Sequence, residues 1–205
     1  MLRRAFLAAA AAAIVFTAPA FAALSADKQA ELKRITDYWN SIQTVEGDFN
    51  QVDNKGGAST GKFYIKKPGR FRFDYNPPDQ LTVVADGYTV AVEDRKLETQ
   101  DRYPLVETPL SILVDQNITL QRPDLQILDV EKKDGLVRVR LKSLKEDAQG
   151  ELLLAFADAD LALQYWVVRD PQGTTVTVRV GNVTLQGNIS ADKFFIREKE
   201  EDDGR

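Results

Sequence analysis

The stretch that decides the fold is Gly61-Lys-Phe-Tyr-Ile-Lys-Lys-Pro-Gly-Arg-Phe-Arg-Phe-Asp-Tyr75. From residue 70 onward aromatic and charged residues alternate, so the aromatic side chains point to one face and the charged ones to the other. Residues 61–66 form a candidate strand before it, and the two runs are separated by turn residues. The stretch therefore predicts two short neighbouring strands with one strongly apolar face.

Similar short runs continue along most of the chain and are separated by turn signals such as Asn76-Pro-Pro-Asp79, Asp86-Gly87, Asp134-Gly135 and Pro171-Gln-Gly173. Regular spacing with tight turns predicts an antiparallel meander of about eleven strands in a single domain. The expected strands are residues 61–66, 70–75, 81–85, 88–93, 96–102, 126–132, 135–143, 151–157, 162–169, 174–180 and 183–185.

Two helices are expected beside this sheet. Ser25 can cap an amphipathic helix that runs to about Thr44. Its apolar stripe comprises Leu32, Ile35, Trp39, Ile42 and Val45. A second, short helix interrupts the meander, with Thr108 as its N-cap and Pro109 at its first position. Helices within such an antiparallel sheet must cover one of its faces, and loose covering would leave an apolar cavity.

The amino terminus reads as a secretory signal peptide over residues 1–22, with Arg3 and Arg4 before an alanine-rich apolar run and small residues at Ala20 and Ala22. Arg3-Arg4 also resembles a twin-arginine signal, so the export route stays open, and a helical anchor is the alternative. The domain would span 23–196, followed by a charged flexible tail over 197–205. No Cys follows the cleavage site, so the mature chain is not expected to be a lipoprotein itself.

Composition excludes several functional classes. Loss of Arg3 and Arg4 from the 27 basic residues leaves 25 against 31 acidic ones, a net charge of −6, which argues against nucleic acid as a partner. Cysteine is absent, so no disulfide holds the fold. Histidine is absent too, which removes Ser-His-Asp and Cys-His nucleophiles and the commonest zinc ligand.

Paired carboxylates are the remaining route to an enzyme. Asp74 with Asp79, or Glu93 with Asp94, could be imagined as an acid/base pair for glycoside hydrolysis. Adjacent residues on a strand face opposite sides, however, and the charged residues mostly occupy turns or the polar face. We therefore expect no catalytic residue, no metal site and no cofactor.

The decisive stretch, together with four flanking motifs, resembles the outer-membrane lipoprotein carrier family, LolA. The family's pattern has a basic residue before Pro-Gly, then Phe-Arg-aromatic-x-Tyr, Pro-x-x-Gln and Asp-Gly. The resemblance extends from about Leu32 to Ile196. The flanking motifs are Pro78-Asp-Gln80, Asp86-Gly87, Glu107-Thr-Pro-Leu-Ser-Ile-Leu113 and Ala191-Asp-Lys-Phe-Phe195.

This resemblance implies a single unclosed (half) β-barrel, covered by the amino-terminal helix and by the central helix as a lid. It implies a periplasmic chaperone of a Gram-negative bacterium that binds lipoprotein acyl chains in a hydrophobic cavity. Implied partners are an inner-membrane ATP-driven lipoprotein-releasing complex and an outer-membrane lipoprotein receptor, with the carrier a monomer. The alternative on the same fold is a periplasmic protein that binds free lipid or glycolipid, or senses lipids.

The family also implies a role for one basic residue. Its position before Pro-Gly is commonly Arg, which holds the lid over the empty cavity; here that position is Lys67. Lysine lacks the planar fork of arginine, so closure could be weaker or shared with Arg70 or Arg72. The alternative for Lys67 is an ordinary solvated lysine at a strand end.

Side-chain direction gives the expected cavity wall. An ordinary packed core, as in an interaction module with a filled barrel, is the alternative for these positions. The residues are Leu32, Ile35, Trp39 and Ile42 from the first helix, Leu110, Ile112, Leu113 and Val114 from the lid, and Phe63, Ile65, Phe71, Phe73, Leu81, Val83 and Val90 from the sheet.

Overall fold

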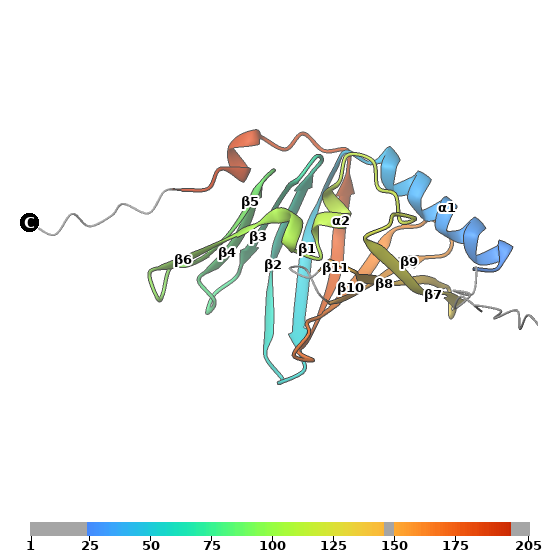
Figure 1. The fold of residues 1–205 in the computed structure, drawn as a ribbon. Helices are drawn as coiled ribbons and strands as arrows, with labels where there is room; N and C mark the ends of the chain where they lie inside the picture. Colours follow the sequence, from blue (N-terminus) through green and yellow to red (C-terminus); the bar gives the residue numbers. More distant parts are fainter. Residues whose placement is uncertain (1–23, 146–149, 198–205) are drawn as a thin grey trace, which may run out of the picture.

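The computed structural model describes residues 24–145 and 150–197, so the expected signal peptide and nearly all of the expected tail lie outside the described residues. One antiparallel sheet of eleven strands forms the body of the protein, in the order β6-β5-β4-β3-β2-β1-β11-β10-β9-β8-β7. Strands β6 and β7 are its two edges and do not pair with each other, so the barrel is unclosed (Figure 1). The expected fold class is confirmed. The strands are β1 (Thr44–Asp53), β2 (Ala58–Lys66), β3 (Arg70–Tyr75), β4 (Leu81–Asp86), β5 (Thr89–Asp94), β6 (Thr99–Pro104), β7 (Leu125–Lys133), β8 (Leu136–Ser143), β9 (Glu151–Ala157), β10 (Leu163–Arg169) and β11 (Thr175–Leu185).

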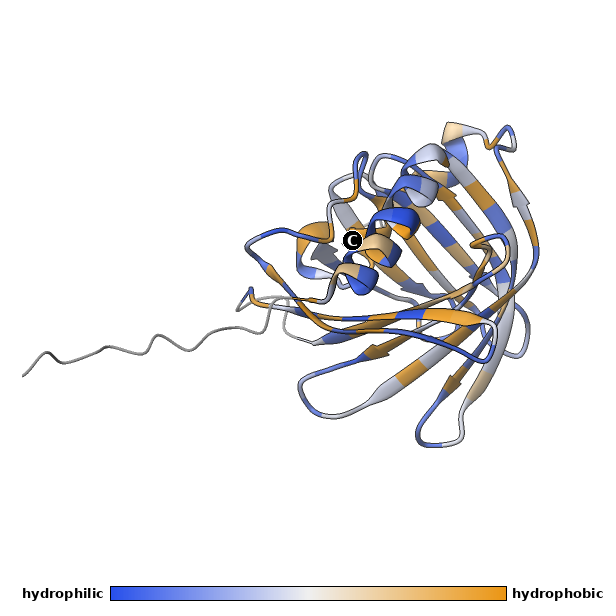
Figure 2. Ribbon diagram, turned by 90° about the vertical axis from the view of Figure 1, so that its right-hand side faces the viewer, coloured by the Kyte–Doolittle hydropathy of each residue, from blue (hydrophilic) through white to orange (hydrophobic). Residues whose placement is uncertain are grey.

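The helices cover the sheet. Helix α1 (Ala26–Ser41) lies within the curve of the strands, over β7, β8 and β9 (Figure 1). Along the strands, hydrophobic and hydrophilic residues alternate, so the two faces of the sheet differ in polarity (Figure 2). The chain between the edge strands β6 and β7 crosses from one edge to the other and carries the 3-10 helix η1 (Leu105–Glu107) and helix α2 (Ser111–Val114). We call residues 105–124 the lid segment. A third short helix, η3 (Ala191–Phe194), follows β11.

The decisive stretch forms the β2–β3 hairpin, as expected. Phe63 pairs with Phe73 and Ile65 with Phe71, and all four side chains are buried. Residues at alternate positions of a strand point to the same side, so these four side chains share one face of the sheet. They pack in the same apolar cluster as α1 and the lid segment, so this face is the concave one.

Two strand predictions were wrong. No strand was expected at residues 44–53, yet β1 lies there, at the centre of the sheet, and residues 174–180 and 183–185 are one continuous strand, β11. β1 carries few apolar residues, and Gly47 interrupts it; a Cβ there would lie 2.8 Å from the carbonyl oxygen of Gly181. The pairing of β1 with β11 shifts in register between Glu46 and Asp48, and this β-bulge accommodates the close approach of Gly47 to Gly181. β11 therefore continues through residues 181–182, where the sequence predicted a break between two strands.

The predicted end of the first helix and the predicted start of the central helix were also wrong. Helix α1 ends at Ser41 and not near Thr44, because Ile42 is already extended and Val45 belongs to β1. Helix α2 begins at Ser111, with Leu110 in the N-cap position. Thr108 is instead the C-cap of the preceding 3-10 helix η1, and its hydroxyl donates to the carbonyl of Leu105 at 2.8 Å.

Candidate functional site

The concave face of the sheet, α1 and the lid segment share one apolar cluster. Val83 and Leu110 are partly buried against it, and Leu81 lies apart, in a surface depression at the start of β4. The remaining expected wall residues are all members of the cluster: Leu32, Ile35, Trp39, Ile42, Phe63, Ile65, Phe71, Phe73, Val90, Ile112, Leu113 and Val114.

The centre of the cluster is aromatic, and sequence reasoning missed half of it. Phe73 makes edge contacts with Phe49 at 5.5 Å and with Trp166 at 5.9 Å between ring centroids, and Trp39 meets Phe156 at 6.0 Å. Phe156 and Trp166 lie on β9 and β10, whose alternation was visible in the sequence. This alternation identifies Phe156 and Trp166 as residues of one strand face. Their contact with the aromatic residues of the other half depends on the pairing of β1 with β11, which joins the two halves of the sheet.

The interior is filled in this conformation. The void between α1, the lid segment and β9 measures about 10 Å³ and is bounded by Ile35, Trp39, Ile112, Leu113 and Phe156, among others. A void of this size holds about one water molecule, so an acyl chain does not fit in it. The expected cavity is therefore closed here, and a ligand could enter only where the helices and the lid segment move away from the sheet.

Lys67 is buried and not solvated. Lys67 is only 5% exposed. Its ammonium donates a hydrogen bond to the backbone carbonyl of Trp39, and Nζ lies 5.4 Å from the centre of the Trp39 ring. Burial lowers the pKa of Lys67 to about 8, and the charge of Asp115 acts in the opposite direction. The solvated interpretation was wrong. Lys67 contacts helix α1 rather than the lid backbone.

Two hydrogen bonds to backbone carbonyls fasten the lid segment near Lys67. The indole nitrogen of Trp39 donates to the carbonyl of Leu113 at 2.9 Å, so the ring beside Lys67 also holds α2. The amide of Gly69, in the turn after Lys67, donates to the carbonyl of Val114 at 2.7 Å. Lys67, Trp39 and the β2–β3 turn thus form a continuous contact between α1, the sheet and the end of α2.

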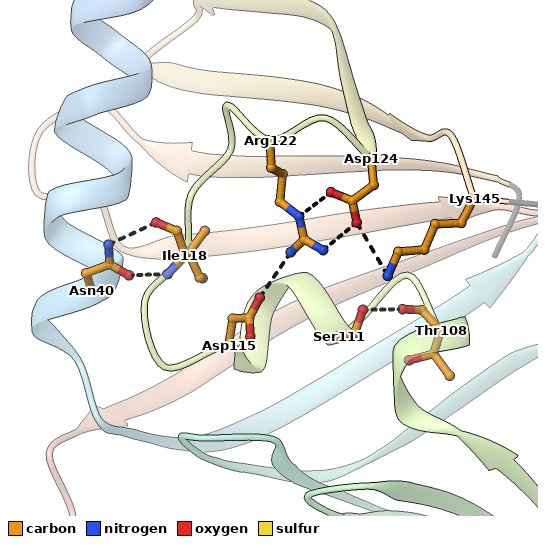
Figure 3. A network of polar contacts seen from close by, with 8 residues as sticks. All are labelled: Asn40, Thr108, Ser111, Asp115, Ile118, Arg122, Asp124 and Lys145. Carbon is orange, nitrogen blue, oxygen red and sulfur yellow. Dashed lines mark hydrogen bonds and ion pairs between the residues drawn. The ribbon is translucent and has the colours of Figure 1, made fainter.

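Asn40 fastens the loop after α2, and no sequence motif points to this role. Its side chain donates to the carbonyl of Ile118 at 3.0 Å and accepts from the amide of Ile118 at 2.7 Å (Figure 3). A paired amide contact of this kind satisfies both backbone groups of an irregular segment. One polar side chain at the end of α1 therefore positions the middle of the lid segment.

An ion-pair network holds the last part of the lid segment. Arg122 binds both carboxylate oxygens of Asp124 and contacts Asp115 at 3.1 Å, while Nζ of Lys145 lies 3.4 Å from Asp124 (Figure 3). The Arg122 hydrogen bonds lower the pKa of Asp124 to about 2. The network joins the lid segment to itself and to the chain after β8.

Helix α1 is tied to the far half of the sheet by ion pairs near its start. Lys28 meets Asp129 of β7 at 2.7 Å, and Arg34 meets Asp158, just after β9, at 2.7 Å. Lys132 of β7 adds a contact to Asp158 at 2.9 Å. These partly exposed pairs orient α1 more than they stabilise the fold.

Within residues 24–145 and 150–197, no helix is long and apolar enough to cross a bilayer, and no group of three or more acidic residues is arranged to hold a metal ion. The unclosed sheet, its apolar concave face and the separate lid segment place this protein in the class of half-barrel proteins with a hydrophobic interior.

Comparison with known proteins gives the family. The profile described as "Outer membrane lipoprotein carrier protein LolA" matches residues 40–197, and the chain belongs to this family. The outer-membrane lipoprotein carrier protein of Leptothrix cholodnii is 33% identical over 62% of this chain and 64% of that protein. That of Halorhodospira halophila is 26% identical over 84% of both, and that of Cupriavidus pinatubonensis 25% identical over 95% of this chain and 94% of that one.

Solved structures are more distant. A LolA superfamily protein from Nitrosomonas europaea matches with a TM-score of 0.45 and 9% identity, covering 80% of this chain and 97% of that one. MucB matches with a TM-score of 0.46 and 13% identity, covering 84% of this chain and 64% of that one. Neither adds to the family assignment.

Proposed function

We propose that this protein is a periplasmic carrier that takes lipoproteins from the inner to the outer membrane by sheltering their acyl chains against the concave face of its sheet. The observation that carries the proposal is the combination of family membership with one continuous apolar interior that a separate segment closes. The role is that of a binding protein, without catalysis. Its partners would be a releasing complex at the inner membrane and a receptor at the outer membrane.

The energetics show why a carrier is required. A lipoprotein has three acyl chains on its terminal cysteine, and each buried methylene contributes ~0.8 kcal/mol. Three chains of about fifteen methylenes therefore amount to roughly 36 kcal/mol, so free diffusion through water is excluded. A carrier must replace most of that apolar contact and still release its cargo.

The closed interior supplies a means of release. Ile112, Leu113 and Val114 of the lid segment are buried in the apolar cluster of the closed structure. An acyl chain would displace these side chains and take their place, so binding exchanges one set of apolar contacts for another. When the cargo leaves, the lid closes again, and this recovered burial offsets part of the cost of release.

Lys67 is proposed to bias this equilibrium through Trp39. The backbone carbonyl of Trp39 accepts a hydrogen bond from the Lys67 ammonium, and the indole nitrogen of Trp39 donates one to the carbonyl of Leu113 in α2. Because the ammonium is desolvated and, among the described residues, has the Trp39 carbonyl as its one hydrogen-bond acceptor, its burial lowers the stability of the closed state and makes opening easier. The proposed role is thus to position Trp39, and through it α2.

The decisive experiment is release of a radiolabelled lipoprotein from spheroplasts on addition of the purified protein. Lipoprotein in the supernatant, bound to the carrier, is the expected result. The matched variants are Leu113→Glu in the lid and Leu97→Glu in the exposed β5–β6 turn, where the side chain is 67% exposed. Release by the wild type and by the Leu97 variant, but not by the Leu113 variant, supports the proposal.

The same preparation tests the alternative. Lipid extraction of the loaded protein separates covalently acylated polypeptide from free lipid or glycolipid. Recovery of free lipid alone, with no lipoprotein released, would assign the half-barrel to lipid binding or sensing and would overturn the carrier proposal.

A further inference from the structure

A groove of about 520 Å³ lies outside the closed interior, between helix α1 and residues 119–121 of the lid segment. Its α1 wall includes Ala26, Gln29, Ala30 and Lys33, which are spaced three or four residues apart and so share one face. Figure 1 shows the lid segment running beside α1 on its way from α2 to β7. Binding sites for small molecules measure ~300–1,000 Å³, so the groove has the size that the 10 Å³ interior void lacks.

The groove and the interior void are neighbours. Thr36 and Leu120 belong to the walls of both. The groove also reaches Leu32, which with Leu120 is a member of the central apolar cluster, at 2% and 4% exposure. A single layer of side chains therefore separates the outside from the interior, and Leu120 is part of that layer.

In the part of the chain that the structure describes, the seam between α1 and residues 119–121 is held by apolar packing and not by hydrogen bonds. Among the described residues, the hydrogen bonds that join α1 to the lid segment come from Trp39 and Asn40, at the end of the helix. The earlier turns of α1 make none to residues 119–121, and their ion pairs attach the helix to β7 and to the chain after β9. Separation of the seam would therefore move the loop and leave α1 in place.

The groove combines apolar walls with neutral polar groups and carries little net charge. Gln29, Thr119 and Gln121 offer amide and hydroxyl groups. The two charges, Lys33 and Asp37, pair with each other at 2.5 Å. Such walls suit ester, amide and thioether groups, which accept or donate hydrogen bonds without charge, better than they suit a phosphate.

We infer that the seam between α1 and residues 119–121 is the port through which acyl chains reach the interior, with Leu120 as its gate. The groove then holds the uncharged glyceryl-cysteine linkage while the chains lie inside. This inference rests on the proposed function, because it names the route into the same apolar interior. The other route, past the β2–β3 turn and the end of α2, crosses the Trp39 and Gly69 hydrogen bonds.

A reversible linker across the seam tests the port. The chain has no cysteine, so Lys33→Cys with Thr119→Cys places two thiols on opposite walls of the groove. A bis-methanethiosulfonate linker joins them, and dithiothreitol removes it. The control pair is Asp48→Cys with Lys62→Cys, whose side chains form a 3.0 Å ion pair between β1 and β2 on exposed positions. The probe is the methyl ester of a long-chain fatty acid with a terminal fluorophore.

The expected result is loss of probe uptake in the linked seam variant, recovery after dithiothreitol, and normal uptake by the linked control. Normal uptake with the seam linked would overturn the port while leaving the carrier proposal intact. Absence of uptake by the wild type and by every unlinked variant would instead remove the proposed function.

A second pair of variants avoids any linker. Ala30→Trp fills the groove from an exposed position, and Asp27→Trp places the same side chain on α1 outside the groove. The Ala30 variant should slow probe association by about tenfold, or ~1.4 kcal/mol in the barrier. The Asp27 variant should leave it unchanged. Equal association rates for the two variants would contradict the port.

Discussion

Replacement of Lys67 by Met separates the charge of this residue from its bulk. Methionine fills a similar volume without the ammonium, so the apolar packing around Trp39 is largely kept. The Trp39 carbonyl does not become unsatisfied, because it also accepts a hydrogen bond from the amide of Ile42 at 3.2 Å. The substitution therefore removes one buried charge and little else.

The sign of the pH effect follows from the direction of the pKa shift. Burial lowers the pKa of Lys67 from 10.5 to about 8. The unfolded chain thus holds one more proton than the folded chain between these values, so the free energy of unfolding rises with pH across this window. Below pH 8 both states are protonated and the cost of the buried charge is fully present. A shift of this size corresponds to about 3 kcal/mol.

The assay is chemical and thermal unfolding of both proteins from pH 7 to pH 10.5. The stability of the wild type relative to Lys67→Met should rise by about 3 kcal/mol over this range, or roughly 6–12 °C in Tm. Lys55→Met, in the exposed β1–β2 hairpin, is the matched control and should track the wild type. A difference between wild type and Lys67→Met that stays constant with pH would refute the buried-charge reasoning.

Three further outcomes are expected. Asn40→Ala removes both contacts to the lid backbone and should cost about 1–3 kcal/mol, with faster hydrogen exchange in residues 112–118; Asn76→Ala, an exposed control, should show neither change. Leu113→Glu places a charge in the closed interior and should abolish uptake of an apolar fluorescent probe, and normal uptake would mean that α2 does not cover the binding surface. Asp124→Asn should remove an acid-sensitive lid contact: the Asp124 pKa is lowered to about 2, so its stabilisation is present above pH 4 and lost as the pH falls toward 2. Exchange in the lid segment measured against pH checks this, and identical profiles for variant and wild type would count against it.

The filled interior bears on how such a protein can work. A permanently open apolar cavity would expose its lining to water, whereas here the lid side chains occupy the space themselves. If the protein is a carrier as proposed, binding depends on the free energy of lid opening, which few polar contacts control. Lys67 and Asn40 lie outside the expected wall, so substitutions there would change that free energy without altering the wall of the site.

Local patterns sufficed for much of the fold. Alternation from Arg70 to Tyr75 predicted which side chains of the β2–β3 hairpin face inward, and the Asp134-Gly135 turn predicted the β7–β8 hairpin. Both are properties of neighbouring residues, and both residues of that turn have positive φ. β1 was missed because its polar residues and Gly47 give no apolar alternation; its strand conformation is set by pairing with β2 and β11.

Hydrophobic period and turn chemistry act over a few residues, so most of the antiparallel strands, the apolar face of the sheet and the two covering segments can be read from the chain alone. Four features emerge only in the folded molecule: Lys67 is buried, Asn40 holds the lid segment, Phe156 and Trp166 complete the aromatic centre, and the interior is closed. Each of these depends on contacts between residues far apart in the chain. Such contacts are set by how an unclosed sheet curves around the elements that fill it.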